Sequence, residues 1–355
     1  MTIPIAARKA DHLTLCATGD VSFRAKGTLL ADVRLVHEAL PDLALGDIDL
    51  SCELLGKRLR APIIVAAMTG GTEEALRVNR ELAALAEARG YGFGLGSQRA
   101  MHVREGTAHT YHVRDVAPTT LVLGNLGVVQ AREMRTEEIE ALVSAVGADA
   151  LCVHLNPAME LVQPGGDRDF RGGTETLSRL ARELSVPVVA KETGCGIAPG
   201  TARRIAEAGV RFVDVSGAGG TSWVGVETKR AEEAGDARAR ALGEAFWDWG
   251  VPTAASIALV SALGLVTIGT GGIQSGLDVA RALALGATAC GFARPVLKAL
   301  HESGRAGADA FFDRVEAELR AAMLLTGSRR VADLRRAPRV VVGELALWLD
   351  QLAAP

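Results

Sequence analysis

Aromatic residues and long hydrophobic runs are both scarce in the sequence, and each shortage excludes a class of protein. Aromatic residues make up only 4% of the chain. No stretch approaches the roughly 18 consecutive apolar residues that a membrane-spanning helix needs, and the first residues lack the apolar segment of a secretory signal peptide. The net charge of -3 provides no excess of basic residues for nucleic acid or an anionic membrane. We therefore expect a cytoplasmic protein that binds neither nucleic acid nor a membrane.

Cysteine is also rare, and its five copies are scattered without a CxxC spacing. That spacing is the usual signature of structural zinc sites and redox motifs. Because the count is odd, at least one cysteine would stay unpaired in any set of disulfides. We expect a reducing compartment and no structural zinc.

Glycine and aliphatic residues are abundant instead. The 355 residues include 40 glycines, and hydrophobic residues make up 48% of the chain. This length corresponds to one large domain or two small ones, with enough apolar residues for a sizeable core. A glycine-rich chain with few aromatic residues is typical of α/β folds, in which many tight turns connect strands and helices.

A unit of one buried strand followed by one helix recurs along the chain. Residues 62–67 are apolar without polar alternation, as in parallel sheets covered on both faces. Thr72 then caps a helical pattern that Gly90 ends. Eight strands are predicted, at 61–67, 92–95, 119–123, 150–154, 187–191, 211–215, 265–269 and 289–292. Further helical patterns are predicted at 136–146, 174–184, 200–208, 237–248, 276–286, 294–302 and 308–325.

Eight such units favour a (β/α)8 TIM barrel. A doubly wound sheet is the alternative, but it would carry a GxGxxG turn after its first strand, and that turn is absent from this sequence. We predict an N-terminal extension at 1–60, the barrel at 61–305, and a C-terminal helical tail at 306–355 that packs on the barrel.

Polar residues gather just after the ends of the predicted strands. In a barrel these ends converge on one face, where the active sites of such folds lie. The densest cluster runs from His154 to Glu160, and its imidazole and carboxylate could hold a metal or move protons. The alternative is that His154 is a hydrogen-bonded core histidine and Glu160 a solvated loop residue. The other clusters are Ser97-Gln98-Arg99, Gly124-Asn125, Lys191–Gly194, Asp214–Ser222, Gly269–Ile273 and Gly291–Arg294.

The last two clusters predict a phosphate site. Loops after the seventh and eighth strands form the usual phosphate site of such barrels, and glycine lets backbone N–H groups approach the anion closely. Ser275 or Gly276 could open the helix whose positive end faces that phosphate. An ordinary tight turn is the alternative.

Two further features point to function. Lys191 ends a buried strand and could form a Schiff base or supply charge next to an electron-rich ring. The segment 216–236 is expected to be a long loop that acts as a lid. Within the long loops, Asp167–Asp169 and Gly219–Trp223 are the parts expected to become ordered when ligand binds.

Taken together, short motifs along the chain resemble those of the FMN-dependent type 2 isopentenyl diphosphate isomerases. The resemblance covers nearly the whole chain in order, and the family fold is a TIM barrel, in agreement with the count of eight. Each short glycine motif is weak alone, but the set is specific. The matching pieces are Arg8-Lys9, His12-Leu13, Met68–Gly71, Gly94–Arg99, Gly124–Gly127, His154–Asn156, Gln163-Pro164, Gly166–Phe170, Lys191–Gly196, Asp214–Trp223 and Gly271–Ile273.

The resemblance implies ligands and roles. FMN would contact Met68, Thr69, Gly70, Ser97, Asn125, Lys191, Ser216 and Thr221, with its phosphate on Gly271, Gly272, Ile273, Ala293 and Arg294. The prenyl diphosphate substrate would meet Arg8, Lys9, Ser97, Gln98, Arg99, His154, Asn156 and Met159. Glu160 would hold Mg²⁺, and the candidate catalytic residues are His154, Glu160 and Lys191. NADPH would reduce the flavin, the N-terminal extension would contribute to the active site, and the protein would be a homo-oligomer, a tetramer or octamer.

The sequence departs from the family pattern at two points. The family has Gln immediately before the metal-binding Glu, where this chain has Met159. The family's Pro-Glu-Gly-Asp is here Pro164-Gly165-Gly166-Asp167. A Gln amide donates and accepts hydrogen bonds, whereas a thioether is at best a weak acceptor. Met159 could instead fill the same space with apolar contact to the prenyl tail.

The function that the resemblance implies is the interconversion of isopentenyl and dimethylallyl diphosphate by a 1,3-proton shift. An FMN-dependent oxidoreductase of the 2-hydroxy acid oxidase or inosinate dehydrogenase kind is one alternative, although neither the His base nor the reactive Cys of those enzymes is evident. The other alternative is a catalytically impaired FMN protein that binds prenyl diphosphates, which Met159 suggests.

Overall fold

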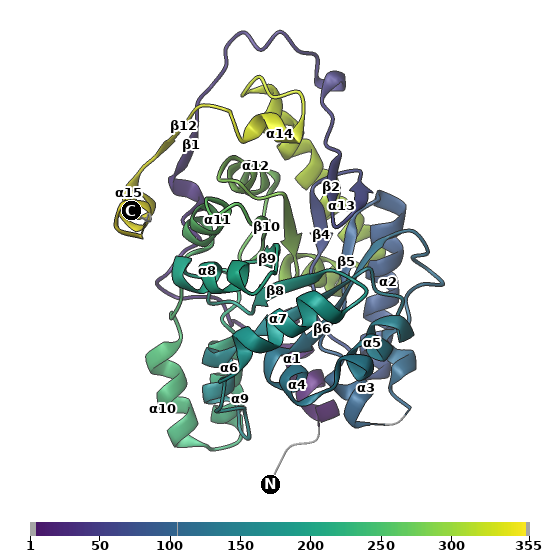
Figure 1. Cartoon of the computed structure of the whole chain (residues 1–355). Coiled ribbons are helices and arrows are strands. Elements are labelled where there is room, and N and C mark those ends of the chain that lie inside the picture. Colours follow the sequence, from purple (N-terminus) through teal and green to yellow (C-terminus); the bar gives the residue numbers. More distant parts are fainter. Residues whose placement is uncertain (1–4, 105, 353–355) are drawn as a thin grey trace.

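The computed structural model describes residues 5–104 and 106–352, with the side chains of residues 5–10 and of Leu13 outside that description. Eight parallel strands form a closed barrel in the order β10-β11-β4-β5-β6-β7-β8-β9 (Figure 1). The strands are β4 (Ile63–Val65), β5 (Gly92–Gly94), β6 (Leu121–Gly127), β7 (Ala150–Leu155), β8 (Val188–Glu192), β9 (Phe212–Asp214), β10 (Val266–Gly269) and β11 (Ala289–Phe292). Each coincides with a predicted strand, so the (β/α)8 prediction is confirmed and the doubly wound alternative is wrong.

Helices surround the barrel and connect successive strands (Figure 1). Thr72 caps α2 by accepting a hydrogen bond from the Ala75 N–H, and Gly90, at φ 67°, ends it, as predicted. The helices after the first seven strands are α2 (Glu73–Arg89), α3 (Arg99–Val103), α4 (Val128–Glu133), α5 (Thr136–Ala145), α6 (Pro157–Val162), α7 (Gly173–Glu183), α8 (Pro199–Glu207), α9 (Trp223–Glu233), α10 (Ala237–Phe246), α11 (Thr253–Ser261) and α12 (Gly276–Ala284).

The apolar core has two parts. One lies between the strands and the surrounding helices, and the other fills the barrel interior. The hairpin of β2 (Cys52–Leu54) and β3 (Lys57–Leu59) contributes Leu54 and Leu59 to the interior cluster, together with Ile64 and Leu121 near the start of barrel strands. The hairpin therefore closes the amino end of the barrel and leaves the carboxyl end for ligands.

A strand from the N-terminal segment pairs with a strand from the C-terminal tail on the outside of the barrel. Strand β1 (Val33–Leu35) pairs antiparallel with β12 (Arg339–Val341). The kinked helix α13 (Arg294–Leu324) follows the last barrel strand, and α14 (Val331–Leu334) and α15 (Gly343–Leu352) complete the tail. Helix α1 (Ile5–Thr18) packs against α13 and α9. The division at residues 60 and 305 stays a prediction.

The long loop predicted at 216–236 is wrong, because it contains helix α9. Ser222 caps this helix by accepting a hydrogen bond from the Gly225 N–H. The buried face of α9 carries Glu227 and Arg230, which form an ion pair with each other. Two charged residues on the buried face interrupt the apolar periodicity, which explains why the sequence pattern suggested a loop.

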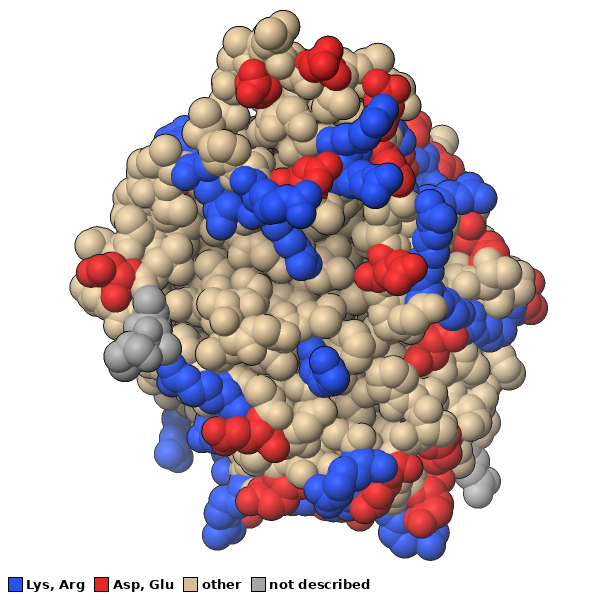
Figure 2. Space-filling model, turned by 45° about the horizontal axis from the view of Figure 1, so that its top comes forward, with Lys and Arg blue, Asp and Glu red and all other residues tan. Residues whose placement is uncertain are grey.

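The surface carries charges of both signs. Figure 2 shows Lys and Arg interspersed with Asp and Glu on the face that carries α14, without a broad area of one sign. Among the residues that the structure describes, no helix combines the length and the apolar character needed to cross a bilayer.

Stability should depend on the aromatic contacts that hold α13 to the barrel. Phe312 is fully buried and makes edge-to-face contacts with Tyr91, Phe292 and Phe311. We expect Phe312→Ala to lower the free energy of unfolding, measured by urea denaturation, by about 3–5 kcal/mol through the lost contacts and the cavity left behind. Phe246→Ala, at a residue that is 40% exposed on α10, is the control and should cost much less. Equal losses in both variants would contradict this account.

Candidate active site

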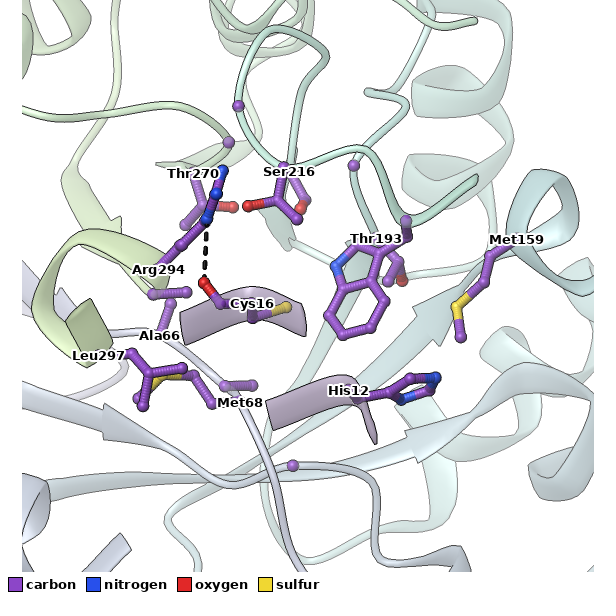
Figure 3. A pocket seen from close by; sticks show the side chains of 18 of the residues that line it. His12, Cys16, Ala66, Met68, Met159, Thr193, Ser216, Thr270, Arg294 and Leu297 are labelled. Atoms are coloured by element: carbon purple, nitrogen blue, oxygen red, sulfur yellow. Dashed lines mark hydrogen bonds between the residues drawn. The ribbon is translucent and has the colours of Figure 1, made fainter. Parts of the chain in front are cut away.

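A cavity of about 690 Å³ opens at the carboxyl ends of the barrel strands. This volume lies within the usual range for small-molecule sites. Residues from the ends of the barrel strands, from the N-terminal segment and from the start of α13 line it, and Figure 3 shows ten of them labelled. The predicted site residues on its wall are Met68, Thr69, Ser97, Arg99, Asn125, His154, Asn156, Met159, Glu160, Lys191, Ser216, Thr221, Gly271, Gly272, Ile273, Ala293 and Arg294.

Two predicted residues lie behind the wall instead. The Gln98 side chain is fully buried, where its Oε1 accepts from the Asn125 N–H and its Nε2 donates to the Leu142 carbonyl. Gly70 allows close packing, since a Cβ there would lie 2.1 Å from the Tyr111 ring. Both residues therefore support the site from outside the cavity. Arg8 and Lys9 fall in α1, but their side chains are outside the described part of the chain.

Asn125 determines which ring nitrogen of His154 carries a hydrogen. The Asn125 Nδ2 donates to the Leu95 carbonyl at 3.1 Å, so its Oδ1 is the atom that lies 2.8 Å from Nδ1 of His154. Because an amide oxygen only accepts, Nδ1 of His154 carries a hydrogen. The neutral ring then has its acceptor at Nε2, and the protonated ring donates there. His154 is thus both hydrogen-bonded, as in the core-histidine alternative, and part of the cavity wall.

Three donors in the described part of the chain hold the Glu160 carboxylate, and Glu160 is only 7% exposed. Oε1 accepts from Nδ2 of Asn156 at 2.8 Å, and Oε2 accepts from Nε2 of Gln163 at 3.0 Å and from the Asp167 N–H at 2.8 Å. A Cβ on Gly166 would lie 2.2 Å from the Glu160 carbonyl oxygen and 2.8 Å from Oε2. Glu160 is therefore a fixed, buried carboxylate, and the solvated-loop alternative is wrong.

Lys191 is 9% exposed and forms an ion pair with Asp214, with 3.0 Å between Nζ and Oδ2. Nζ also donates to the Glu192 carbonyl at 3.0 Å. To form a Schiff base, the Lys191 amine would have to leave this ion pair and would leave the buried Asp214 carboxylate without its cation. The geometry therefore favours the charge-supplying role over the Schiff base.

The glycine turn after β10 brings backbone to the cavity. Gly271 has φ 96°, and a Cβ on it would lie 2.2 Å from the Gly217 carbonyl oxygen. A Cβ on Gly220 would lie 2.3 Å from the Gly272 nitrogen. Side chains at these positions would push apart the two loops that form this end of the cavity.

The helix that begins at this end is α13, which corrects the prediction for Ser275 and Gly276. Ser275 does cap α12, but the Gly276 N–H donates to the Glu318 carboxylate at 2.7 Å. Neither residue lines the cavity, whereas Ala293, Arg294 and the first turn of α13 do. The N-terminus of α12 was expected to face the phosphate because its cap, Ser275, is recognisable in the sequence. The sequence does not reveal that the Glu318 carboxylate on α13 already binds this terminus.

Arg294 holds the N-terminal segment over the cavity. Its guanidinium donates to the carbonyls of Cys16 and Gly19 and to the Ser22 hydroxyl, at 2.6–3.0 Å (Figure 3). Burial raises the pKa of the Cys16 thiol to about 11, although the charge of Arg294 opposes that rise. The thiol is therefore protonated at neutral pH.

Helix α1 is also attached to α9. His12 lies 2.7 Å from the fully buried Glu227, which pairs with Arg230, and Arg230 also contacts Asp11. The His12 ring packs edge-on against Trp223 with 5.2 Å between centroids. Burial opposes the charge of Glu227, but the hydrogen bond and charge of His12 and the charge of Arg230 outweigh it and lower the pKa of that carboxyl. The N-terminal residues thus form part of the cavity wall.

Several lining residues were given no specific role from the sequence. Thr193, Thr270 and Trp223 fall in segments that were expected at the site, whereas Gln130 and Lys298 were not predicted at all. Gln130 lies on α4, where its Nε2 donates to the Asp167 carboxylate at 2.7 Å. Thr193 and Thr270 lie beside predicted residues at strand ends, which is a usable signal. Lys298 and Gln130 lie within helices and carry no local sign of a ligand.

The cavity has the features that a flavin would need. Thr69 Oγ1 is the one buried side-chain polar atom without a hydrogen-bond partner in the described residues, and it lies on the cavity wall. A buried polar atom without a hydrogen-bond partner is energetically unfavourable unless a ligand or water supplies one.

For a metal, the described residues contain no cluster of three or more His, Cys, Asp or Glu. The single carboxylate of Glu160 suits Mg²⁺ only if phosphate oxygens and water complete the coordination.

The sequence matches the family model described as FMN-dependent dehydrogenase over residues 4–161 and 169–340. It is 43% identical to the isopentenyl-diphosphate delta-isomerase of Methanothermobacter thermautotrophicus, over 98% of this chain and 96% of that protein. The enzyme of the same name from Halobacterium salinarum is 44% identical over 97% of this chain and 96% of its own length.

Solved structures share the fold at much lower identity. A mandelate oxidase mutant with a monooxide FMN adduct aligns with a TM-score of 0.64 at 20% identity, over 93% of this chain and 95% of that one. A lactate oxidase of Pediococcus acidilactici aligns with a TM-score of 0.65 at 16% identity, over 97% of this chain and 96% of that one. The chain therefore belongs to the FMN-dependent dehydrogenase family, and within it to the isopentenyl-diphosphate delta-isomerases that its motifs resemble.

Proposed function

We propose that the protein interconverts isopentenyl and dimethylallyl diphosphate with bound reduced FMN and Mg²⁺. The observation that carries this proposal is the meeting of four features in one cavity: the His154 imidazole, the Glu160 carboxylate, the Lys191 ammonium and the glycine turn at 271–272. The relatives named for this isomerisation, at 43% and 44% identity, support the substrate.

The reaction moves a proton and leaves the redox state of the substrate unchanged. One end of an unactivated alkene gains a proton and the other end loses one, and no ordinary side chain is a strong enough acid for this at neutral pH. Reduced FMN, when bound, supplies protonatable ring positions and so carries the difficult chemistry. NADPH would serve to reduce the flavin.

The residues of the chain would bind and orient the substrate. With Nδ1 of His154 donating to Asn125, a protonated ring would have a second donor, at Nε2, for the diphosphate. Arg99 and Asn156 line the same cavity and would add donors. Glu160, fixed by Asn156, Gln163 and the Asp167 backbone, would hold Mg²⁺ against the diphosphate while the ion keeps several waters.

The other end of the cavity would hold the flavin. The backbone of Gly271, Gly272 and Ile273 and the first residues of α13 would receive its phosphate. Thr69 Oγ1 would gain the partner that it lacks. Lys191 would stabilise negative charge on the reduced ring. The homo-oligomeric state and the cytoplasmic location stay predictions.

An FMN-dependent oxidoreductase remains the second candidate, since the mandelate and lactate oxidases share the fold. The thiol of Cys16, with its pKa raised to about 11, is not the reactive thiolate of an inosinate dehydrogenase site. Measuring proton exchange into isopentenyl diphosphate with dithionite-reduced protein separates the candidates. Exchange supports the isomerase, while oxidation of a 2-hydroxy acid without exchange supports the oxidase. Binding without either activity supports the impaired prenyl-diphosphate binder.

FMN binding is the first test. The purified protein should be yellow or take up one FMN per chain in a fluorescence titration. Gly272→Ala should weaken FMN binding at least tenfold, because φ is 75° there and a Cβ would lie 2.4 Å from Thr28. Gly264→Ala is the matched control, with φ 76° and no atom within 4 Å of the added Cβ. A colourless protein that ignores added FMN would refute the proposed function.

Magnesium dependence tests the role of Glu160. Glu160→Gln should abolish Mg²⁺-dependent turnover and leave FMN affinity nearly unchanged, because the neutral amide is a poor ligand for a hard cation. Gly166→Ala should raise the Mg²⁺ concentration needed for half-maximal turnover, since its Cβ would displace Glu160. Gly200→Ala, with nothing within 4 Å, is the control. Unaltered turnover in Glu160→Gln would place the metal elsewhere.

Met159 tests the departure from the family. Its side chain lines the cavity with Thr193 and His12 (Figure 3). If the family's Gln orients the reacting alkene, its absence should cost about 2–4 kcal/mol in the transition state, or roughly 10²–10³ in rate. Met159→Gln should then raise kcat with little change in KM, because the diphosphate contacts lie elsewhere. Mg²⁺ dependence must stay unchanged in the variant, since Glu160 is the next residue. A fast wild-type enzyme that the Gln variant does not exceed would show that the amide is dispensable.

A further inference from the structure

Asp214 is a buried carboxylate beneath the cavity that the proposed function leaves without a role. It is the last residue of β9 and is 5% exposed. Oδ2 lies 3.0 Å from the Lys191 ammonium, and Oδ1 accepts hydrogen bonds from the Ser216 N–H at 3.2 Å and from the Thr270 hydroxyl. These three partners all line the cavity, whereas Asp214 itself lies behind it. One carboxylate thus connects three cavity residues.

The barrel register places this carboxylate. Lys191 on β8 pairs directly with Asp214 on β9, so their side chains lie side by side. Neighbouring β10 ends at Gly269, and Thr270 follows it. An unpaired ammonium inside the barrel would be strongly unfavourable, and a carboxylate at the adjacent register position compensates it.

Asp214 also holds a strained residue. Ser216 has φ 36°, in the left-handed region that side chains rarely adopt. Its N–H is bound by Asp214, and its carbonyl accepts from the N–H groups of Gly194 and Gly196, each at 3.0 Å. The backbone at the end of β9 is thereby fixed from both sides.

We propose that Asp214 is a positioning residue that fixes Lys191 and Ser216 and sets the net charge that the protein presents to a flavin, an inference that rests on the proposed FMN binding. The ion pair presents less positive charge than a lone ammonium does. Negative charge on the reduced ring is therefore stabilised less, and the bound flavin has a lower reduction potential than a lone Lys191 ammonium would give it.

The test is the reduction potential of FMN bound to Asp214→Asn, measured against a reference dye. Asn keeps the shape of the Asp214 side chain and loses its charge. The equilibrium ratio of reduced to oxidised flavin should therefore rise at least tenfold, which raises the reduction potential by about 30 mV for a two-electron couple.

Glu192→Gln is the matched control. This carboxyl is buried one residue from Lys191, its oxygen accepts from the N–H groups of Thr193 and Cys195, and it does not line the cavity. Burial raises the pKa of Glu192 to about 8, so the substitution removes little charge at pH 7 and should leave the potential unchanged.

Two further measurements keep the proposal testable. Thr270→Val removes a hydrogen-bond donor that partly offsets the charge of Asp214, and it should shift the ratio of reduced to oxidised flavin a few-fold in the opposite direction. Without flavin, Asp214→Asn should raise the rate of Lys191 acylation at pH 8, followed by mass spectrometry, at least tenfold, since the amine is no longer held in the ion pair with Asp214.

The outcomes separate this inference from the proposed function. If the protein binds FMN and isomerises its substrate while Asp214→Asn changes neither the potential nor the acylation rate, only the role of Asp214 is overturned. If FMN does not bind, the proposed function fails, and the acylation rate still decides whether Asp214 controls Lys191.

Discussion

The hydrogen bonds between β11 and β4 are the constraint on which the rest of the structure depends. They pair Cys290 with Ile63 and close the sheet into a barrel. Because all eight strands are parallel, closure brings every strand end to one rim. Residues as far apart as Met68 and Arg294 thereby share a single cavity. An open sheet with the same strands would spread those residues along an edge.

Much of the fold was predictable because each strand is a short apolar run bounded by glycine or polar residues. Helix α1 and the short helices α3, α4 and α6 were not predicted, and neither were α9 and α11. In α9 the buried Glu227 and Arg230 are charged residues at positions where the pattern of an amphipathic helix requires apolar ones. Helix α11 is buried on nearly every side, so its sequence shows no amphipathic period. The strand ends identified most of the cavity wall. The inward or outward direction of Gln98, Asp214 and Gln130 depends on tertiary partners that no local pattern reveals.

Two charged groups of the site are buried and held by partners. Glu160 accepts hydrogen bonds from Asn156, Gln163 and the Asp167 backbone, and Lys191 pairs with Asp214, so both groups already lie in fixed positions before any ligand binds. Groups that are fixed in advance need no reorganisation as charge moves during a reaction. The thioether of Met159 also lines this cavity, directly before Glu160 in the sequence, and has neither a charge nor a strong hydrogen-bonding group.

The pairing of β1 with β12, which are far apart in the sequence, has a consequence for biosynthesis. Val33 pairs with Val341, and the barrel closes only when residue 290 reaches residue 63. On the ribosome, the first strands are made long before their partners and present open sheet edges to the cell. Contacts of such sequence separation form slowly even in the released chain. The protein is therefore most prone to aggregation while it is being made, and conditions that slow translation or deplete chaperones will reduce its yield more than its final stability suggests.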